Sequence, residues 1–178
     1  MADIIMAGLG GQGVLTAGKV LINVAAAQGK NVSWTSTYGA AMRGGSAKCS
    51  IVVSDEEIGS PYPTKIDILL AMSEDAYTTY IHDVRLGGCA VVNGSMVKDI
   101  TVPEGVSVYS VDATDEANAV GNARAANLVM LGAMLKASGL MDAEQFGEGL
   151  DAYFGKKGHS DPSNMQCYRA GIETVVFR

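Results

Sequence analysis

A glycine-rich turn directly after the first apolar run constrains this chain more than any other feature of its sequence. Residues 4–7 are apolar, and Gly8, Gly10 and Gly13 follow in the pattern G-x-G-x-x-G before a helical stretch over residues 14–28. Strand–turn–helix units of this kind are typical of dinucleotide-binding α/β proteins. We expect Gly8 and Gly10 to let an anion approach the backbone and Gly13 to let the helix pack tightly on the strand. The free N–H groups at the helix start would then face phosphate.

One part of the dinucleotide pattern is missing. An Asp or Glu that binds the ribose hydroxyls normally follows about 20 residues later. Here the second predicted strand, Asn31–Ser36, leads into Thr37 and Tyr38 without an acidic residue. NADP would tolerate this absence, because cations suit a 2′-phosphate.

Strand-like and helix-like stretches alternate along the whole chain. Further strands are predicted over residues 47–54, 67–71, 89–93 and 107–111, and further helices from Ser73, over 112–120 and 122–138, from Asp142 to about 154, and over 164–173. No linker or repeat divides the chain. We therefore predict one domain over residues 1–178, a three-layer α/β/α fold with a mostly parallel, Rossmann-like sheet. Residues 46–54 could instead add an antiparallel pairing.

Composition limits the class of function. The net charge of −6 argues against a nucleic-acid-binding protein, for which a basic face is expected. Cys49, Cys89 and Cys167 form no C-x-x-C pair, so we expect no zinc or iron–sulfur site on this chain alone, and reduced core thiols at Cys49 and Cys89. No signal peptide is visible and the most apolar helix is too short to cross a bilayer, so a cytoplasmic protein is expected.

Charge is also sparse, at 18% of residues against 48% hydrophobic ones. Two explanations remain open, a dense α/β core or a surface partly buried by partner subunits. Between Asp3 and Asp55 there is no acidic residue, whereas four basic ones occur, Lys19, Lys30, Arg43 and Lys48. An acid-free block around a glycine turn suits an anionic ligand or an acidic partner surface.

A second glycine-rich segment follows the second strand. It reads Y-G-A-A-M-R-G-G-S from Tyr38 to Ser46. Ligands of open α/β sheets bind beyond the carboxyl ends of strands. Arg43 could form a forked pair with a carboxylate or phosphate there, and Gly44 and Gly45 would let the backbone approach it. The alternative is a surface loop in which Arg43 pairs with an acid of another subunit.

Familiar catalytic constellations are absent from the sequence. His82 and His159 have no nucleophile near them in the chain, and no G-x-S-x-G elbow occurs. The chain by itself is therefore expected to be a binding module, with no catalytic residue of its own.

Together, these residues resemble the gamma subunit or domain of 2-oxoacid:ferredoxin oxidoreductases. The resemblance is carried by G-L-G-G-Q-G at residues 8–13, by S-T-Y-G at 36–39 with M-R-G-G at 42–45, and by I-V-V-S-D at 51–55. Residues 67–71, 87–88, 121–127 and 131–132 also match, in family order. Ala40 and Ala41 depart from the family, which often has a proline and an acid at these positions.

The resemblance implies a subunit of an enzyme that decarboxylates a 2-oxoacid oxidatively, reduces ferredoxin and forms an acyl-CoA. Alpha, beta and delta-type subunits would be the partners and would hold thiamine diphosphate and the iron–sulfur clusters, while coenzyme A is a substrate. The residues expected near coenzyme A and the subunit interface are Gly8, Gly10, Gly11, Gln12, Gly13, Ser36, Thr37, Tyr38, Arg43, Gly44 and Gly45. A stand-alone NAD(P)-binding oxidoreductase and a purely structural subunit are the alternatives.

Overall fold

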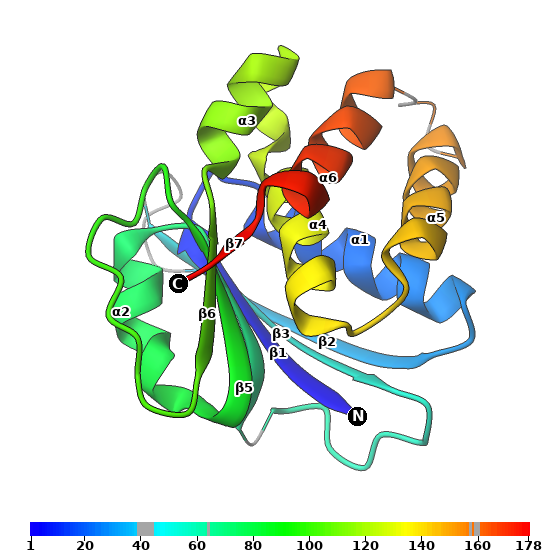
Figure 1. The fold of residues 1–178 in the computed structure, drawn as a ribbon. Helices are drawn as coiled ribbons and strands as arrows, with labels where there is room; N and C mark the ends of the chain where they lie inside the picture. Colours follow the sequence, from blue (N-terminus) through cyan, green and yellow to red (C-terminus); the bar gives the residue numbers. More distant parts are fainter. Residues whose placement is uncertain (39–44, 64, 157, 159–160) are drawn as a thin grey trace.

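The computed structural model describes residues 1–38, 45–63, 65–156, 158 and 161–178, and shows helices packed on a single mixed sheet (Figure 1). Among these residues the sheet has seven strands in the order β2-β3-β1-β4-β5-β6-β7. The pairings β1–β4, β4–β5 and β5–β6 are parallel, whereas β2–β3, β3–β1 and β6–β7 are antiparallel. The expected α/β fold is confirmed, and residues 46–54 pair antiparallel with both of their neighbours.

The strands follow the apolar runs of the sequence. Their bounds are β1 Ala2–Leu9, β2 Asn31–Tyr38, β3 Ser46–Ser54, β4 Ile66–Ala71, β5 Val84–Asn93, β6 Ser107–Val111 and β7 Val176–Phe177. In β1 every residue from Asp3 to Ala7 is buried, because helices or loops cover both faces of this central strand.

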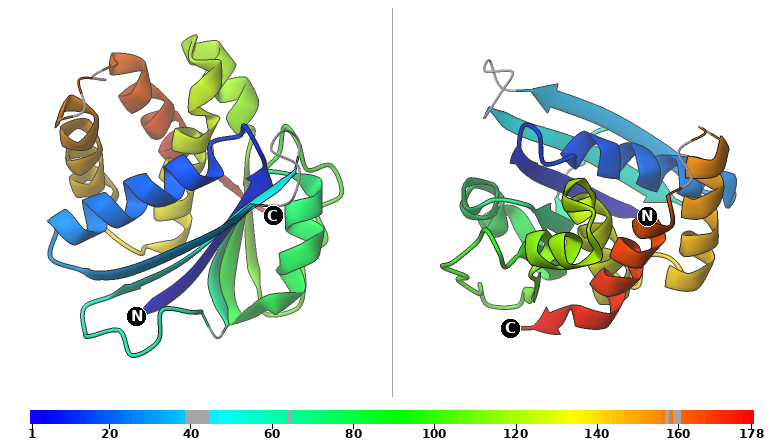
Figure 2. Two further views of the ribbon diagram at one scale, coloured as in Figure 1. Left: turned by 180° about the vertical axis from the view of Figure 1, so that it is seen from behind. Right: turned by 90° about the horizontal axis from the view of Figure 1, so that it is seen from above.

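The helices form two unequal layers. Their bounds are α1 Val14–Ala27, α2 Glu74–Tyr80, α3 Ala113–Val120, α4 Ala126–Ser138, α5 Ala143–Lys156 and α6 Pro162–Thr174, with short 3-10 turns η1 Ile81–Asp83 and η2 Ala123–Ala125. The larger core cluster joins one face of the sheet to α1, α4, α5 and α6, and the smaller one joins the other face to α2 (Figure 2). No described helix combines the length and the apolar composition that crossing a membrane requires.

Helix ends follow the expected capping chemistry. The Ala76 N–H donates to Ser73 Oγ at the start of α2, and the Gln145 N–H donates to Asp142 Oδ1 at the start of α5. Gly139 ends α4 with φ 62°, a left-handed conformation that glycine adopts without strain.

Several boundaries differ from the sequence-based prediction, and three of the differences are instructive. Strand β2 continues through Thr37 and Tyr38, because its ladder with β3 runs on to the pair Tyr38–Ala47. Strand β5 begins at Val84, five residues before the predicted start at Cys89. The predicted helix 122–138 is a 3-10 turn followed by α4.

Candidate functional site

The connections that follow β1 and β4 leave the sheet on opposite faces at its carboxyl edge. These two strands are parallel neighbours, yet β1 leads to α1 on one face and β4 leads to α2 on the other. Open α/β sheets bind ligands beyond the carboxyl ends of the strands at such a point. The glycine turn of residues 8–13 lies at this edge, as the sequence predicts.

The inside of the glycine turn is filled by the side chain of Gln12. The Leu9 N–H donates to Gln12 Oε1 at 2.6 Å, and Gln12 Nε2 donates to the Met72 carbonyl at 3.0 Å, just after β4. A Cβ on Gly8 would lie 2.5 Å from Gln12 Oε1. The packing of a side chain of the same turn therefore already accounts for a glycine at position 8, and the predicted role of Gly8 toward a ligand stays a prediction.

A backbone hydrogen bond joins the two glycine-rich segments. The Gly10 N–H donates to the Gly45 carbonyl at 2.8 Å, next to the ladder pair Leu9–Ser46. Two motifs that are more than thirty residues apart in the sequence thus meet at one edge of the sheet. Gly11, with φ 97°, is exposed beside this contact.

Residues of β2 lie one strand further along the same edge. Ser36 and Thr37 are exposed, and they pair with Cys49 and Lys48 of β3. The backbone of Tyr38 ends the β2–β3 ladder. Arg43 and Gly44, together with Gly39 and the alanine pair 40–41, lie outside the described residues, so their predicted role remains a prediction.

The start of α1 has no capping side chain. Gly13 is the N-cap residue with φ 78°, and no acidic residue lies in the first turn. The first N–H groups of an α-helix have no acceptor within the helix and carry its positive end, so this terminus can receive an anion.

Gly13 packs against a different element from the one predicted. A Cβ on Gly13 would lie 2.7 Å from Nδ2 of Asn127, on α4, and that amide donates to the Gly13 carbonyl at 3.2 Å. The glycine that brings α1 close to the sheet is instead Gly18, whose Cβ would lie 2.7 Å from Cys49 Sγ and 3.0 Å from Trp34 Nε1.

Asn127 and the Met72 carbonyl are site groups that sequence reasoning missed. Asn127 is 5% exposed and is the one amide in an otherwise apolar run, which was the available signal. Buried amides are retained where they make hydrogen bonds, so an isolated Asn among apolar residues points to a specific partner. The Met72 carbonyl carried no such signal, because every residue has one.

The three cations of the acid-free block that the structure describes, Lys19, Lys30 and Lys48, each have a partner of their own. The Lys19 ammonium lies 5.7 Å from the Trp34 ring centroid, and that of Lys48 lies 4.8 Å from the Tyr80 ring centroid. Lys30 pairs with Asp55 at the opposite end of β2 and lowers the pKa of that carboxyl. Arg43, the fourth cation of the block, lies outside the described residues, and its place beside the turn stays a prediction.

The three cysteines are free and buried. Cys49 of β3 and Cys89 of β5 are core residues. Burial raises the pKa of Cys49 to about 12 and that of Cys89 to about 11, so both thiols are protonated at neutral pH. Within the described residues, no group of three or more His, Cys, Asp or Glu side chains could hold a metal ion.

Comparison with known proteins decides the family. The model of the pyruvate ferredoxin/flavodoxin oxidoreductase family matches residues 3–174. The chain belongs to this family. The resemblance to its gamma subunits, based on the two glycine motifs, is thereby confirmed.

Relatives carry this unit either alone or within a longer chain. The chain is 34% identical to the 2-oxoglutarate synthase subunit KorC of Methanothermobacter marburgensis, over 98% of this chain and 96% of that one. It is 35% identical to the ketoisovalerate oxidoreductase subunit VorA of the same organism, over 94% of this chain. It spans only 35% of the length of VorA.

Solved structures of the family share the fold. The gamma subunit of a keto/oxoacid ferredoxin oxidoreductase from Geobacter sulfurreducens superposes with a TM-score of 0.80 at 26% identity, with 97% of both chains covered. A 2-oxoglutarate:ferredoxin oxidoreductase from Magnetococcus marinus, with 2-oxoglutarate, coenzyme A and succinyl-CoA bound, gives 0.82 at 26% identity. That match covers 96% of this chain and 30% of the other.

Proposed function

We propose that this chain is the gamma subunit of a multi-subunit 2-oxoacid:ferredoxin oxidoreductase. The assembled enzyme would convert a 2-oxoacid and coenzyme A to acyl-CoA and CO2, and pass two electrons to ferredoxin. Alpha, beta and delta-type subunits would bind thiamine diphosphate, which supplies the decarboxylation chemistry, and the iron–sulfur clusters. The names of the relatives favour 2-oxoglutarate or a branched-chain oxoacid, and their similar identities do not choose between the two.

Within that enzyme, the proposed role of this chain is to bind coenzyme A at the carboxyl edge of the sheet. The observation that supports it most is the Gly10–Gly45 hydrogen bond, because it joins the turn to Gly45, the last residue of the M-R-G-G motif that contains Arg43. Coenzyme A carries several phosphate groups. The uncapped start of α1 and the Arg43 guanidinium are groups that bind phosphate. The Magnetococcus marinus structure has coenzyme A bound, which fits coenzyme A as a substrate of the assembled enzyme.

Since Gln12 fills the inside of the turn, the phosphates would lie outside it. The N–H groups of Leu9, Gly10 and Gln12 already have acceptors within the protein. The exposed Gly11 and the first turn of α1 remain available. This geometry also weakens the dinucleotide alternative, which requires the backbone of the turn to approach a pyrophosphate closely.

The test is Arg43→Ala in the assembled enzyme. Loss of a charged hydrogen bond to phosphate should raise the KM for coenzyme A about tenfold or more and leave the KM for the 2-oxoacid unchanged. Arg169→Ala, an exposed arginine of α6, is the matched control. Unchanged kinetics in coenzyme A titrations would remove Arg43 from this role.

A purely structural subunit is the second candidate. The occupied interior of the glycine turn favours it, because there the glycines serve packing around Gln12. Coenzyme A affinity that survives substitution of both glycine segments in the complex would support this alternative.

A further inference from the structure

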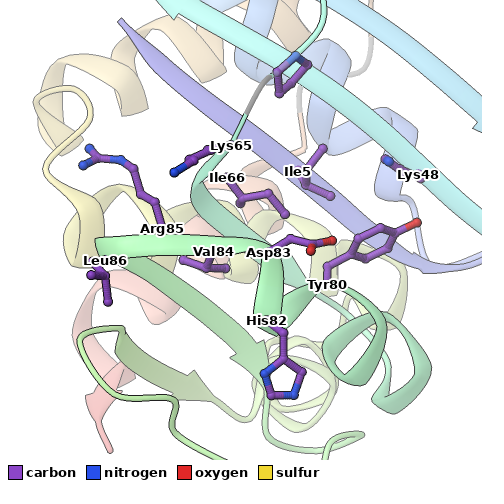
Figure 3. Close-up of a pocket in the computed structure, with 11 residues that line it drawn as sticks. Ile5, Lys48, Lys65, Ile66, Tyr80, His82, Asp83, Val84, Arg85 and Leu86 are labelled. Carbon is purple, nitrogen blue, oxygen red and sulfur yellow. The ribbon is translucent and has the colours of Figure 1, made fainter.

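A cavity of about 550 Å³ lies on the α2 face of the sheet, away from the glycine turn (Figure 3). Its volume is in the range of small-molecule sites. Ile5, Ile66 and Val84, from three different strands, are buried and line its floor. The floor is therefore rigid and apolar.

Charged groups of both signs surround this floor. Figure 3 shows Lys48 and Lys65 on opposite sides of Ile5 and Ile66, with the carboxylate of Asp83 beside the Tyr80 ring. The Tyr80 ring holds the Lys48 ammonium at 4.8 Å from its centroid. Neither Lys65 nor Asp83 has an ion-pair partner among the described residues.

The other polar groups of the cavity are committed or point elsewhere. Arg85 pairs with Asp67, which lies on β4. The His82 ring points away from the floor in Figure 3. The groups left for a ligand are thus two ammonium groups, one carboxylate, the Tyr80 hydroxyl and an apolar surface.

We infer that this cavity binds a small zwitterion with an apolar side chain, of the chemical class of the apolar α-amino acids. Its carboxylate would lie between Lys48 and Lys65, its ammonium group would pair with Asp83, and its side chain would cover Ile5, Ile66 and Val84. A simple anion fits less well, because it would also face the Asp83 carboxylate. An amine fits less well, because it would face two lysines. This inference is independent of the role proposed for the glycine turn.

The experiment is a titration of the chain with L-phenylalanine as probe, in which binding is monitored through the amide signals in NMR spectra. Saturable shifts are expected at Ile5, Ile66 and Val84. 3-Phenylpropionate, which lacks the ammonium group, should bind about fivefold more weakly, as expected for the loss of one exposed ion pair. 2-Phenylethylamine, which lacks the carboxylate and so loses the pairs with both lysines, should bind more weakly still.

Variants locate the charges. Lys65→Gln and Asp83→Asn change exposed residues and should each weaken phenylalanine binding about fivefold. Lys136→Gln, an exposed lysine of α4, is the control and should change nothing. Equal affinity for all three probes, shifts confined to another surface, or no saturation at all would each overturn the inference.

Discussion

At the scale of single residues, the side chain of Gln12 explains why a glycine occupies position 8. Gly8 has no room for a Cβ, since Gln12 Oε1, Met72 Cβ and Val14 Cγ2 lie 2.5, 2.9 and 3.0 Å from that position. The glycine is thus explained by its own turn, and a bound phosphate is not needed to account for it. In dinucleotide-binding proteins this glycine pattern lets the backbone approach a ligand. Here the interior of the turn is occupied by a glutamine side chain.

This arrangement predicts a specific thermodynamic coupling. Gly8→Ala should destabilise the fold by about 1–3 kcal/mol through overpacking, and Gln12→Ala by about 1–3 kcal/mol because the Leu9 N–H loses its acceptor. The double variant should cost less than the sum, since removal of Gln12 relieves the closest clash of the new methyl group. Urea unfolding of all four proteins measures this.

Gly59→Ala is the control for that cycle, because Gly59 is exposed and nothing lies within 4 Å of its Cβ position. Additive costs of the two substitutions would show that Gln12 does not fill the turn in solution.

Residue identity alone could not reveal these contacts. The sequence shows Gln12 four residues after Gly8, but its second partner, the Met72 carbonyl, is 60 residues away. Asn127 is 114 residues from the Gly13 carbonyl that it binds. Such pairs depend on tertiary packing, so the sequence predicted that a turn exists here and missed what stabilises it.

At the scale of elements, two helices of the larger layer meet through glycines. A Cβ on Gly132 of α4 would overlap the Tyr168 carbonyl of α6, and a Cβ on Gly171 of α6 would overlap the Val129 carbonyl of α4. The two backbones therefore touch from both sides. The small side chains set the separation of these helices, and α6 closes the core over α4.

We predict that Gly171→Ala destabilises the protein by at least about 2 kcal/mol, because backbone carbonyls cannot move aside as a flexible side chain can. Urea unfolding followed by circular dichroism would measure the loss. The matched control is Gly155→Ala in α5, where the Cβ meets open space and the substitution should be neutral or stabilise by up to about 1 kcal/mol. Equal effects of the two substitutions would contradict a close α4–α6 contact.

Elements were easier to predict than their ends. Apolar runs and terminal glycines located most helices and strands, because burial and left-handed backbone turns leave a local pattern. The end of β2 left none, since Thr37 and Tyr38 are extended only because β3 continues beside them. The antiparallel direction of β3 likewise follows from the return of the chain beside β1, which composition does not record.

At the scale of the whole molecule, the structure bears on the low charge content of the chain. The two core clusters bury a large set of apolar side chains, and large exposed ones such as Tyr62, Leu86 and Phe177 are few among the described residues. A dense core therefore accounts for much of the composition. The case for partner subunits rests on family membership and not on an unusually apolar surface.

Family membership leads to a prediction about assembly. The same unit spans nearly all of KorC and about a third of VorA, so in relatives it occurs both as a separate subunit and within a longer chain. We expect this chain, purified under native conditions from its source by a terminal tag, to bring along a thiamine diphosphate-binding chain and a cluster-bearing ferredoxin-like chain. Mass spectrometry would identify the chains. Extraction of the purified complex should release thiamine diphosphate and iron in amounts proportional to those partner chains.

The Gly171→Ala variant is a useful control, because a damaged fold should lose these partners together. Recovery of the intact chain alone, with a nicotinamide dinucleotide bound, would instead support a stand-alone oxidoreductase and overturn the proposed function.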